Sequence, residues 1–108
     1  MSKSSLRVVY APEAERDLID RADYLAEEAG QRIADRFVEA VAHTLGLLAQ
    51  MPNMGKAFRS RRSRPNQLRT IPASGAFGHS LIFYTCSESE LRVERILHSA
   101  QDLRRFFP

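Results

Sequence analysis

Arginine side chains form the clearest chemical pattern in this chain. The segment KAFRSRRSRPNQLR, residues 56–69, holds six basic residues and no acid, whereas residues 13–39 hold nine of the 13 acids. A guanidinium group donates paired hydrogen bonds to carboxylates and phosphates. We therefore expect this basic segment to contact an anionic partner, either an acidic protein segment or nucleic acid. A solvated loop whose charges balance the acidic residues is the competing interpretation. The arginines concerned are Arg59, Arg61, Arg62, Arg64 and Arg69.

Histidine and cysteine offer less chemistry. His43, His79 and His98 lack the spacing of a metal site, and one cysteine, Cys86, cannot complete it, so no metal is expected. His98 and Asp102 could form an oriented general base across a turn, although a pair that stabilises the turn is the preferred interpretation. Cys86 follows an apolar run, which predicts a small buried thiol without a role.

No other catalytic or cofactor-binding pattern emerges. The acids of residues 13–39 recur at helical spacing beside arginines, as on a solvated helix face. Two isolated glycines, Gly75 and Gly78, do not form a phosphate-binding loop, so no cofactor is expected. Phe58, within the basic segment, could stack on a base or anchor a protein, but we expect it to tuck under the edge of the sheet.

Composition and length are those of one globular domain, residues 1–108. The hydrophobic share is 44% and the charged share 27%, which is ordinary for a compact fold. Apolar runs such as residues 45–49 and 80–86 are too short to cross a bilayer, and the first residues lack the apolar core of a signal peptide. We expect no membrane association and a cytoplasmic location.

The amino-terminal half predicts one strand and two helices. Residues 6–10, LRVVY, favour a strand, and the Ala11-Pro12-Glu13 sequence that follows suits the first turn of a helix. Apolar residues at three- and four-residue intervals predict helices over residues 13–29 and from Ile33 to about Gln50. Gly30 can supply the left-handed residue between them, so the helices should pack as an antiparallel hairpin.

The carboxyl-terminal half predicts three strands. Residues 68–72, 80–86 and 91–98 read as successive antiparallel strands, and a short helical piece begins at Asp102. The last strand alternates apolar and charged residues through Val93 and Ile96 before it loses register. The order β-α-α-β-β-β predicts a two-layer α+β domain, with the helical hairpin packed on a small antiparallel sheet. Where the first strand pairs is left open.

Several sequence pieces resemble one family when taken in order. PEAERDL opens the first helix, ADRF and LLAQMPNMG lie in and after the second, IFY is in the strongest strand, and ILHSAQDL closes the chain. In this order and spacing, residues 6–104 resemble the ParE branch of the RelE/ParE superfamily of bacterial type II toxins. The resemblance implies a helical hairpin on a small antiparallel sheet, and an antitoxin that binds and neutralises the toxin.

The superfamily has two modes of action. RelE-like members cleave mRNA in the ribosomal A site with basic residues and often a tyrosine near the carboxyl terminus, whereas ParE-like members act on DNA gyrase. This chain ends in DLRRFFP without a tyrosine, and Tyr84 lies in the apolar IFY strand. The resemblance therefore favours a non-catalytic inhibitor of DNA gyrase over an mRNA endonuclease.

The expected partners follow from that resemblance. A ParD-like antitoxin would match its acids to the arginines of the basic segment, with Arg95 and His98 as second candidates for contact with antitoxin or target. Direct binding of nucleic acid is secondary. The alternatives that stay open are a ribosome-dependent mRNA interferase and an inactive family member that only binds an antitoxin.

Overall fold

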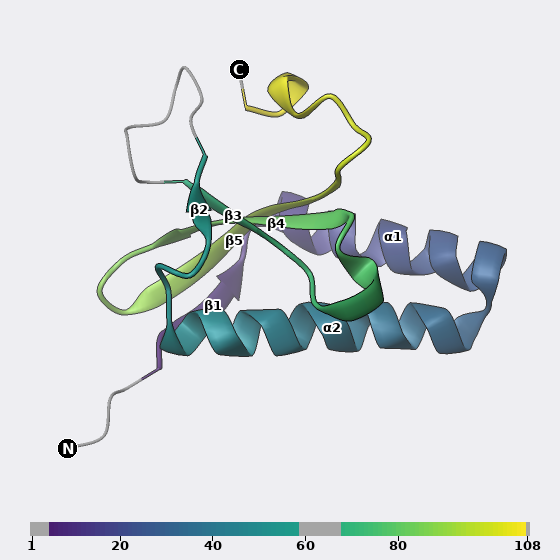
Figure 1. Ribbon diagram of the computed structural model, residues 1–108, viewed down its shortest axis with the longest axis horizontal. Helices are drawn as coiled ribbons and strands as arrows, with labels where there is room; N and C mark the ends of the chain where they lie inside the picture. The colour runs from purple at the N-terminus through teal and green to yellow at the C-terminus, as the bar shows by residue number, and fades with distance from the viewer. Residues whose placement is uncertain (1–4, 59–67, 108) are drawn as a thin grey trace.

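The protein is an α+β fold in which a helical hairpin packs on a five-stranded mixed sheet (Figure 1). The computed structural model describes residues 5–58 and 68–107. This architecture confirms the fold class predicted from the sequence. The elements are β1 (Arg7–Tyr10), α1 (Pro12–Ala29), α2 (Gln31–Gln50), β2 (Lys56–Ala57), β3 (Arg69–Pro72), β4 (Ser80–Cys86) and β5 (Glu90–His98), with single 3₁₀ turns at Gly75–Phe77 and Leu103–Arg105.

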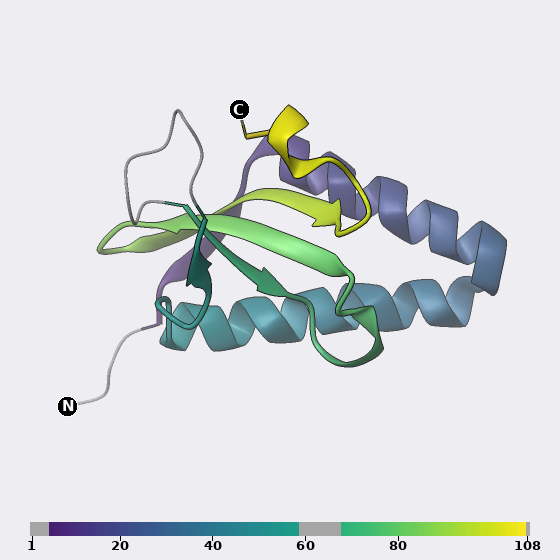
Figure 2. The ribbon, with the colours of Figure 1, turned by 45° about the horizontal axis from the view of Figure 1, so that its top comes forward.

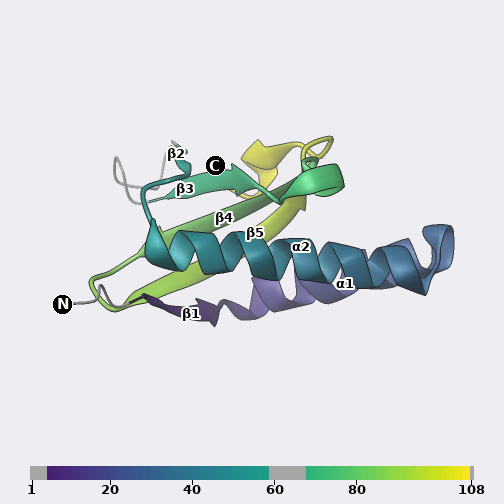
Figure 3. The ribbon, with the colours of Figure 1, turned by 60° about the horizontal axis from the view of Figure 1, so that its bottom comes forward.

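The helical hairpin forms where the sequence predicts it. Pro12 occupies the start of α1, and Glu13 and Glu15 in its first turn complement the helix dipole. Gly30 separates the two helices with a φ of 97°, a conformation that glycine adopts without strain. Figure 3 shows α1 and α2 side by side, with their connecting turn extending beyond the end of the sheet.

The sheet has the strand order β1-β5-β4-β3-β2. Its two central pairings, β3 with β4 and β4 with β5, are antiparallel as predicted. The pairing that the sequence left open is parallel: β1 lies along the first half of β5, with Arg7 opposite Glu90 and Tyr10 opposite Val93. β2 is an unpredicted two-residue edge strand that pairs with β3.

A bulge in β5 explains why its sequence loses the alternating pattern. Tyr84 of β4 pairs with Val93, and the preceding Phe83 pairs with Arg95, so Glu94 has no residue opposite it. One extra residue moves every later side chain to the other face of the sheet. Val93 and Ile96 therefore both face the helices, although they are three positions apart in the strand.

The main core lies between α2 and the sheet. The four-residue spacing in α2 places Phe37, Val41, Leu45 and Leu48 on one buried face, as the sequence predicts. They pack with alternate residues of β4 and with inward-facing residues of β5; these are Ile82, Tyr84, Leu91, Val93 and Ile96. Removing such apolar surface from water is the main stabilising contribution.

A second apolar cluster covers the opposite face of the sheet. Leu68, Phe83 and Leu97 are its buried members. The carboxyl-terminal segment lies over this face, on the side of the sheet away from the helices (Figures 2 and 3). Phe58 packs edge-on against Phe83 with 5.0 Å between ring centroids, which confirms that it tucks against the sheet.

Two further sequence-based expectations can be compared with the structure. Cys86 is exposed, so the prediction of a buried thiol is wrong. Cys86 is the last residue of β4, where the strand passes into an exposed turn. Among the described residues, no helix combines the length and hydropathy needed to cross a membrane.

Candidate functional site

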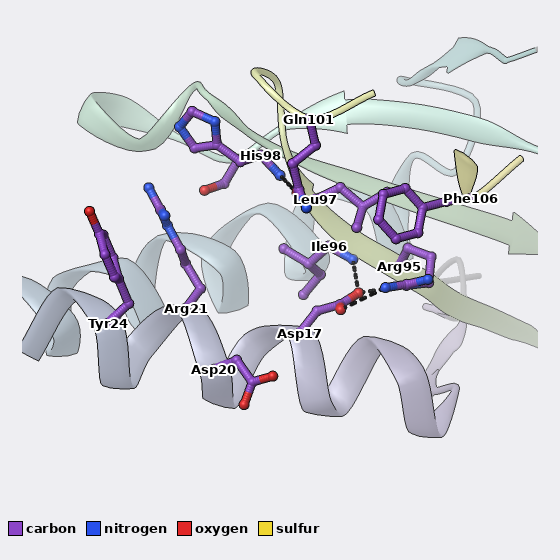
Figure 4. Close-up of a pocket in the computed structure, with 11 residues that line it drawn as sticks. Asp17, Asp20, Arg21, Tyr24, Arg95, Ile96, Leu97, His98, Gln101 and Phe106 are labelled. Atoms are coloured by element: carbon purple, nitrogen blue, oxygen red, sulfur yellow. Dashed lines mark hydrogen bonds and ion pairs between the residues drawn. The ribbon is translucent and has the colours of Figure 1, made fainter. Parts of the chain in front are cut away.

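A groove of about 560 Å³ lies between α1 and the end of β5. Figure 4 shows that Asp17, Asp20, Arg21 and Tyr24 come from α1, while Arg95 and the residues after it line the other side. The turn that follows β5 contributes Gln101, and the carboxyl-terminal segment contributes Phe106. The groove thus collects polar and charged side chains from both ends of the chain.

An ion pair between Asp17 and Arg95 lies at one end of this groove. The Arg95 Nε donates to Asp17 Oδ2 at 2.7 Å and its Nη2 donates to Oδ1 at 2.9 Å. The Ile96 amide also donates to Asp17 Oδ2, at 3.0 Å. Because β1 covers only the first half of β5, Asp17 satisfies a backbone donor on the part of the edge that β1 leaves unpaired.

Arg95 is held on two sides. The hydrogen bonds that Arg95 donates to Asp17 are the main cause that raises the pKa of Arg95, so the guanidinium is charged at every physiological pH. Its Cζ lies 4.6 Å from the centre of the Phe106 ring, a cation–π contact. Arg95 therefore joins α1, β5 and the carboxyl-terminal segment.

His98, the last residue of β5, lies at the other end of the groove. Burial is the main cause that lowers its pKa below the ordinary 6.5, and the nearby charges of Arg21 and His79 lower it further. This shift favours the neutral form of the ring. The Ala100 amide donates to His98 Nδ1 at 3.0 Å, which leaves the proton of the neutral ring on Nε2. His79 stacks on His98 with 5.9 Å between centroids.

The turn after β5 is stabilised from within. The His98 amide donates to Gln101 Oε1 at 2.7 Å, and the Gln101 amide donates to the carbonyl of His98 at 3.0 Å. A direct contact between His98 and Asp102, the pair singled out from the sequence, stays a prediction.

Arg21 is one of the groove residues that sequence reasoning missed. The sequence places it among the solvated charges of the first helix, and its spacing from Asp17 says only that the two share a face. In the structure its guanidinium lies over the Tyr24 ring at 4.9 Å and points toward His98 (Figure 4). Its Nε is buried without a hydrogen-bond partner among the described residues. No sequence signal separates Arg21 from its exposed neighbours.

Tyr84 and Arg69 anchor the connection between α2 and β2. The Tyr84 hydroxyl donates to the carbonyl of Pro52 at 2.8 Å and accepts from the Gly55 amide at 2.9 Å. The Arg69 Nη1 donates to the carbonyl of Gly55 at 2.7 Å. Burial is the main cause that raises the pKa of Tyr84. The hydroxyl gives its single proton to Pro52 and its side chain is fully buried, so a substrate cannot reach it in this fold.

The predicted contact residues are thus separated in space. Arg95 and His98 both line the groove. Arg69 instead lies on β3, with β4 between it and β5. Arg69 also has a structural role of its own through its bond to the loop. The other four predicted arginines, Arg59, Arg61, Arg62 and Arg64, lie outside the described residues.

Comparison with solved structures finds a protein of similar fold. A solved structure described as "Chromosomal ParDE TA system from P. aeruginosa" is similar, with a TM-score of 0.67 and 19% sequence identity over 87% of this chain and 96% of that one. At this identity the likeness concerns the fold alone. Comparison with curated proteins finds no match.

The sequence itself gives the family. The family model described as "ParE toxin of type II toxin-antitoxin system, parDE" matches residues 8–103, nearly the whole chain. The chain belongs to the ParE toxin family.

Proposed function

We propose that this toxin inhibits DNA gyrase by binding it, without catalysing a reaction, and that a ParD-like antitoxin neutralises it. The family match over residues 8–103 is the observation that carries this proposal. The action on gyrase is what the resemblance to ParE toxins implies.

The surroundings of Tyr84 support the non-catalytic part of this proposal. RNA cleavage by protein side chains requires a general acid or base within hydrogen-bond reach of the reacting oxygen. The Tyr84 side chain is 0% exposed and its hydroxyl is fully engaged, so it cannot take that part without unfolding of the loop around Gly55.

A supercoiling assay with purified gyrase and purified toxin tests the target. We expect stoichiometric toxin to inhibit supercoiling, and equimolar antitoxin to restore it. Folded toxin that leaves gyrase fully active at several-fold excess would refute this target. The growth of cells that express the chain alone separates an active toxin from an inactive family member.

The basic segment is proposed to contact the antitoxin. Replacement of Arg61, Arg62 and Arg64 by Gln removes three positive charges from it. The matched control removes three exposed arginines from the helical hairpin instead, by R16Q, R32Q and R36Q. We expect the first variant to bind antitoxin about tenfold or more weakly and the control to lose much less, because close charge pairs add more than distant ones. Equal losses would indicate a net-charge effect only.

A ribosome-dependent mRNA interferase is the second candidate, and the groove supplies the observation that favours it. The Nε2 proton of His98 lies beside His79 and Arg21, an arrangement that could donate a proton to an oxygen near a phosphate. This candidate predicts codon-position-dependent cleavage of transcripts on translating ribosomes, abolished by H98Q. Intact transcripts after toxin induction would exclude it.

A further inference from the structure

Two arginines of the groove differ in their counterions. Arg95 has Asp17, in a two-point ion pair with contacts of 2.7 and 2.9 Å. No ion pair joins Arg21 to any residue in the described part of the chain, and its buried Nε has no hydrogen-bond partner there. Residues 1–4 and 59–67 contain no acidic side chain that could serve instead.

A half-buried cation without a counterion is a costly feature. Burial of a charged group is unfavourable unless an opposite charge or a set of hydrogen bonds compensates for it. Tyr24 provides only a cation–π contact on one face of the Arg21 guanidinium. The donors at the edge of that guanidinium remain suited to a planar, bidentate acceptor, and a carboxylate has that geometry.

His98 adds a second donor at the same place. With Nδ1 engaged by the Ala100 amide, the neutral ring carries its proton on Nε2 and can donate it to an oxygen. Figure 4 shows the Arg21 guanidinium pointing toward this ring, while the Asp20 carboxylate points away from it. Asp17, the other acid that lines the groove, is bonded to Arg95 and to the Ile96 amide.

We propose that Arg21 and His98 form a carboxylate-binding site at this end of the groove, and that one aspartate or glutamate side chain of the antitoxin occupies it. The site rests on the proposed function in taking the antitoxin as its partner. It goes beyond that proposal by assigning the contact to α1 and the end of β5, outside the basic segment.

The walls of the groove favour a protein segment over nucleic acid. The formal charges of Asp17, Asp20, Arg21 and Arg95 sum to zero, so the groove does not attract a chain of phosphates. Apolar surface from Ile96, Leu97 and Phe106 lines the same groove. A segment that carries apolar residues around a single acid matches both features.

Isothermal titration of the purified toxin with the antitoxin encoded beside it tests this site. We expect R21Q to weaken binding by about 10- to 100-fold, the range for loss of a charged hydrogen-bonded pair. R21K keeps the charge without the bidentate fork and should fall between R21Q and the wild type. R16Q is the matched control, since Arg16 is an exposed arginine of the same helix outside the groove, and it should change binding by less than about threefold.

The coupling to one antitoxin acid is the decisive readout. Each Asp and Glu of the antitoxin is replaced in turn by Asn or Gln, and binding is measured to wild-type toxin and to R21Q. We expect one replacement to weaken binding to the wild type and to have little further effect on R21Q. Thermal melts of R21Q establish that the variant is folded, so loss of structure does not imitate this result.

The other outcomes overturn the inference in distinguishable ways. If R21Q binds antitoxin like R16Q, or if no antitoxin acid couples to Arg21, the carboxylate site is wrong while antitoxin binding stands. If wild-type toxin does not bind the antitoxin, neutralisation by direct binding fails, and the site fails with it. If R21Q instead loses affinity for a 12-nucleotide RNA probe and keeps its affinity for the antitoxin, the groove recognises nucleic acid.

Discussion

Removal of the Tyr84 hydroxyl is expected to destabilise the toxin without abolishing its activity. Y84F deletes one oxygen that donates to the carbonyl of Pro52 and accepts from the amide of Gly55. Each net hydrogen bond contributes about 1 kcal/mol, and a buried partner left unsatisfied costs more than an exposed one. Since Gly55 is buried, we expect a loss of about 2 kcal/mol in the free energy of unfolding.

Urea denaturation followed by circular dichroism measures this loss. For a domain of this size, about 2 kcal/mol corresponds to a fall of roughly 8 °C in melting temperature. The slope of the unfolding free energy against urea should stay unchanged, because the variant alters one local set of bonds and not the surface exposed on unfolding. Growth arrest by Y84F at a temperature where it remains folded should match that of the wild type.

Gly55 provides an independent check on the same contact. A Cβ added to Gly55 would lie 2.5 Å from the Tyr84 hydroxyl oxygen and 2.9 Å from the carbonyl of Thr70. G55A should therefore cost about 2 kcal/mol or more. In the double variant with Y84F the closer clash disappears, so the combined loss should be smaller than the sum by about 1 kcal/mol.

Two results would refute this reasoning. Y84F that is as stable as the wild type would show that the hydroxyl does not anchor the loop between α2 and β2. Y84F that is folded and binds gyrase and antitoxin normally, yet no longer arrests growth, would show that Tyr84 takes part in chemistry.

Three further predictions concern the ion pair, the hairpin turn and the groove histidine. D17N should lower the free energy of unfolding, measured in urea, by about 2–3 kcal/mol, because it breaks the largely buried ion pair with Arg95. E90Q breaks the exposed ion pair with Arg7 and should cost about 0–1 kcal/mol. Equal losses would contradict this. G30A should lower the free energy of unfolding by about 1–3 kcal/mol, because alanine is strained at the φ of 97° that Gly30 adopts. The control G46A adds a methyl group in open space on α2 and should be neutral or stabilising. A G30A variant as stable as the wild type would refute the strain. NMR titration should give His98 a pKa below 6.5 in the folded protein. As the pH falls, the unfolded chain then binds a proton at His98 before the folded protein does, so the wild type should lose more stability between pH 7 and 5 than H98Q. A pKa at or above 6.5 would contradict the proposed environment.

Local sequence patterns were sufficient for most of the secondary structure. The four-residue steps from Phe37 to Leu48 define the buried face of α2, because a helix brings such positions onto one side. Pro12 and Gly30 mark helix boundaries through their own backbone preferences. These features depend on interactions between residues close in the chain, so a single sequence contains them.

The sequence also determined the family, through motifs spread along residues 8–103. It indicated that Tyr84 lies in a strand with a core face, and the structure shows the hydroxyl anchored in the loop after α2. Burial of Cys86 was predicted incorrectly because an apolar run does not show where a strand passes into an exposed turn.

Only the tertiary structure decided how the groove is built. The parallel pairing of β1 with the first half of β5 leaves the second half to α1, and this brings Asp17 to Arg95 across 78 residues of sequence. The same arrangement leaves Arg21 near His98 without a counterion in the described chain. The sequence determined the elements and the family because both follow from local patterns, whereas the site depends on a strand pairing between the two ends of the chain, which no local pattern specifies.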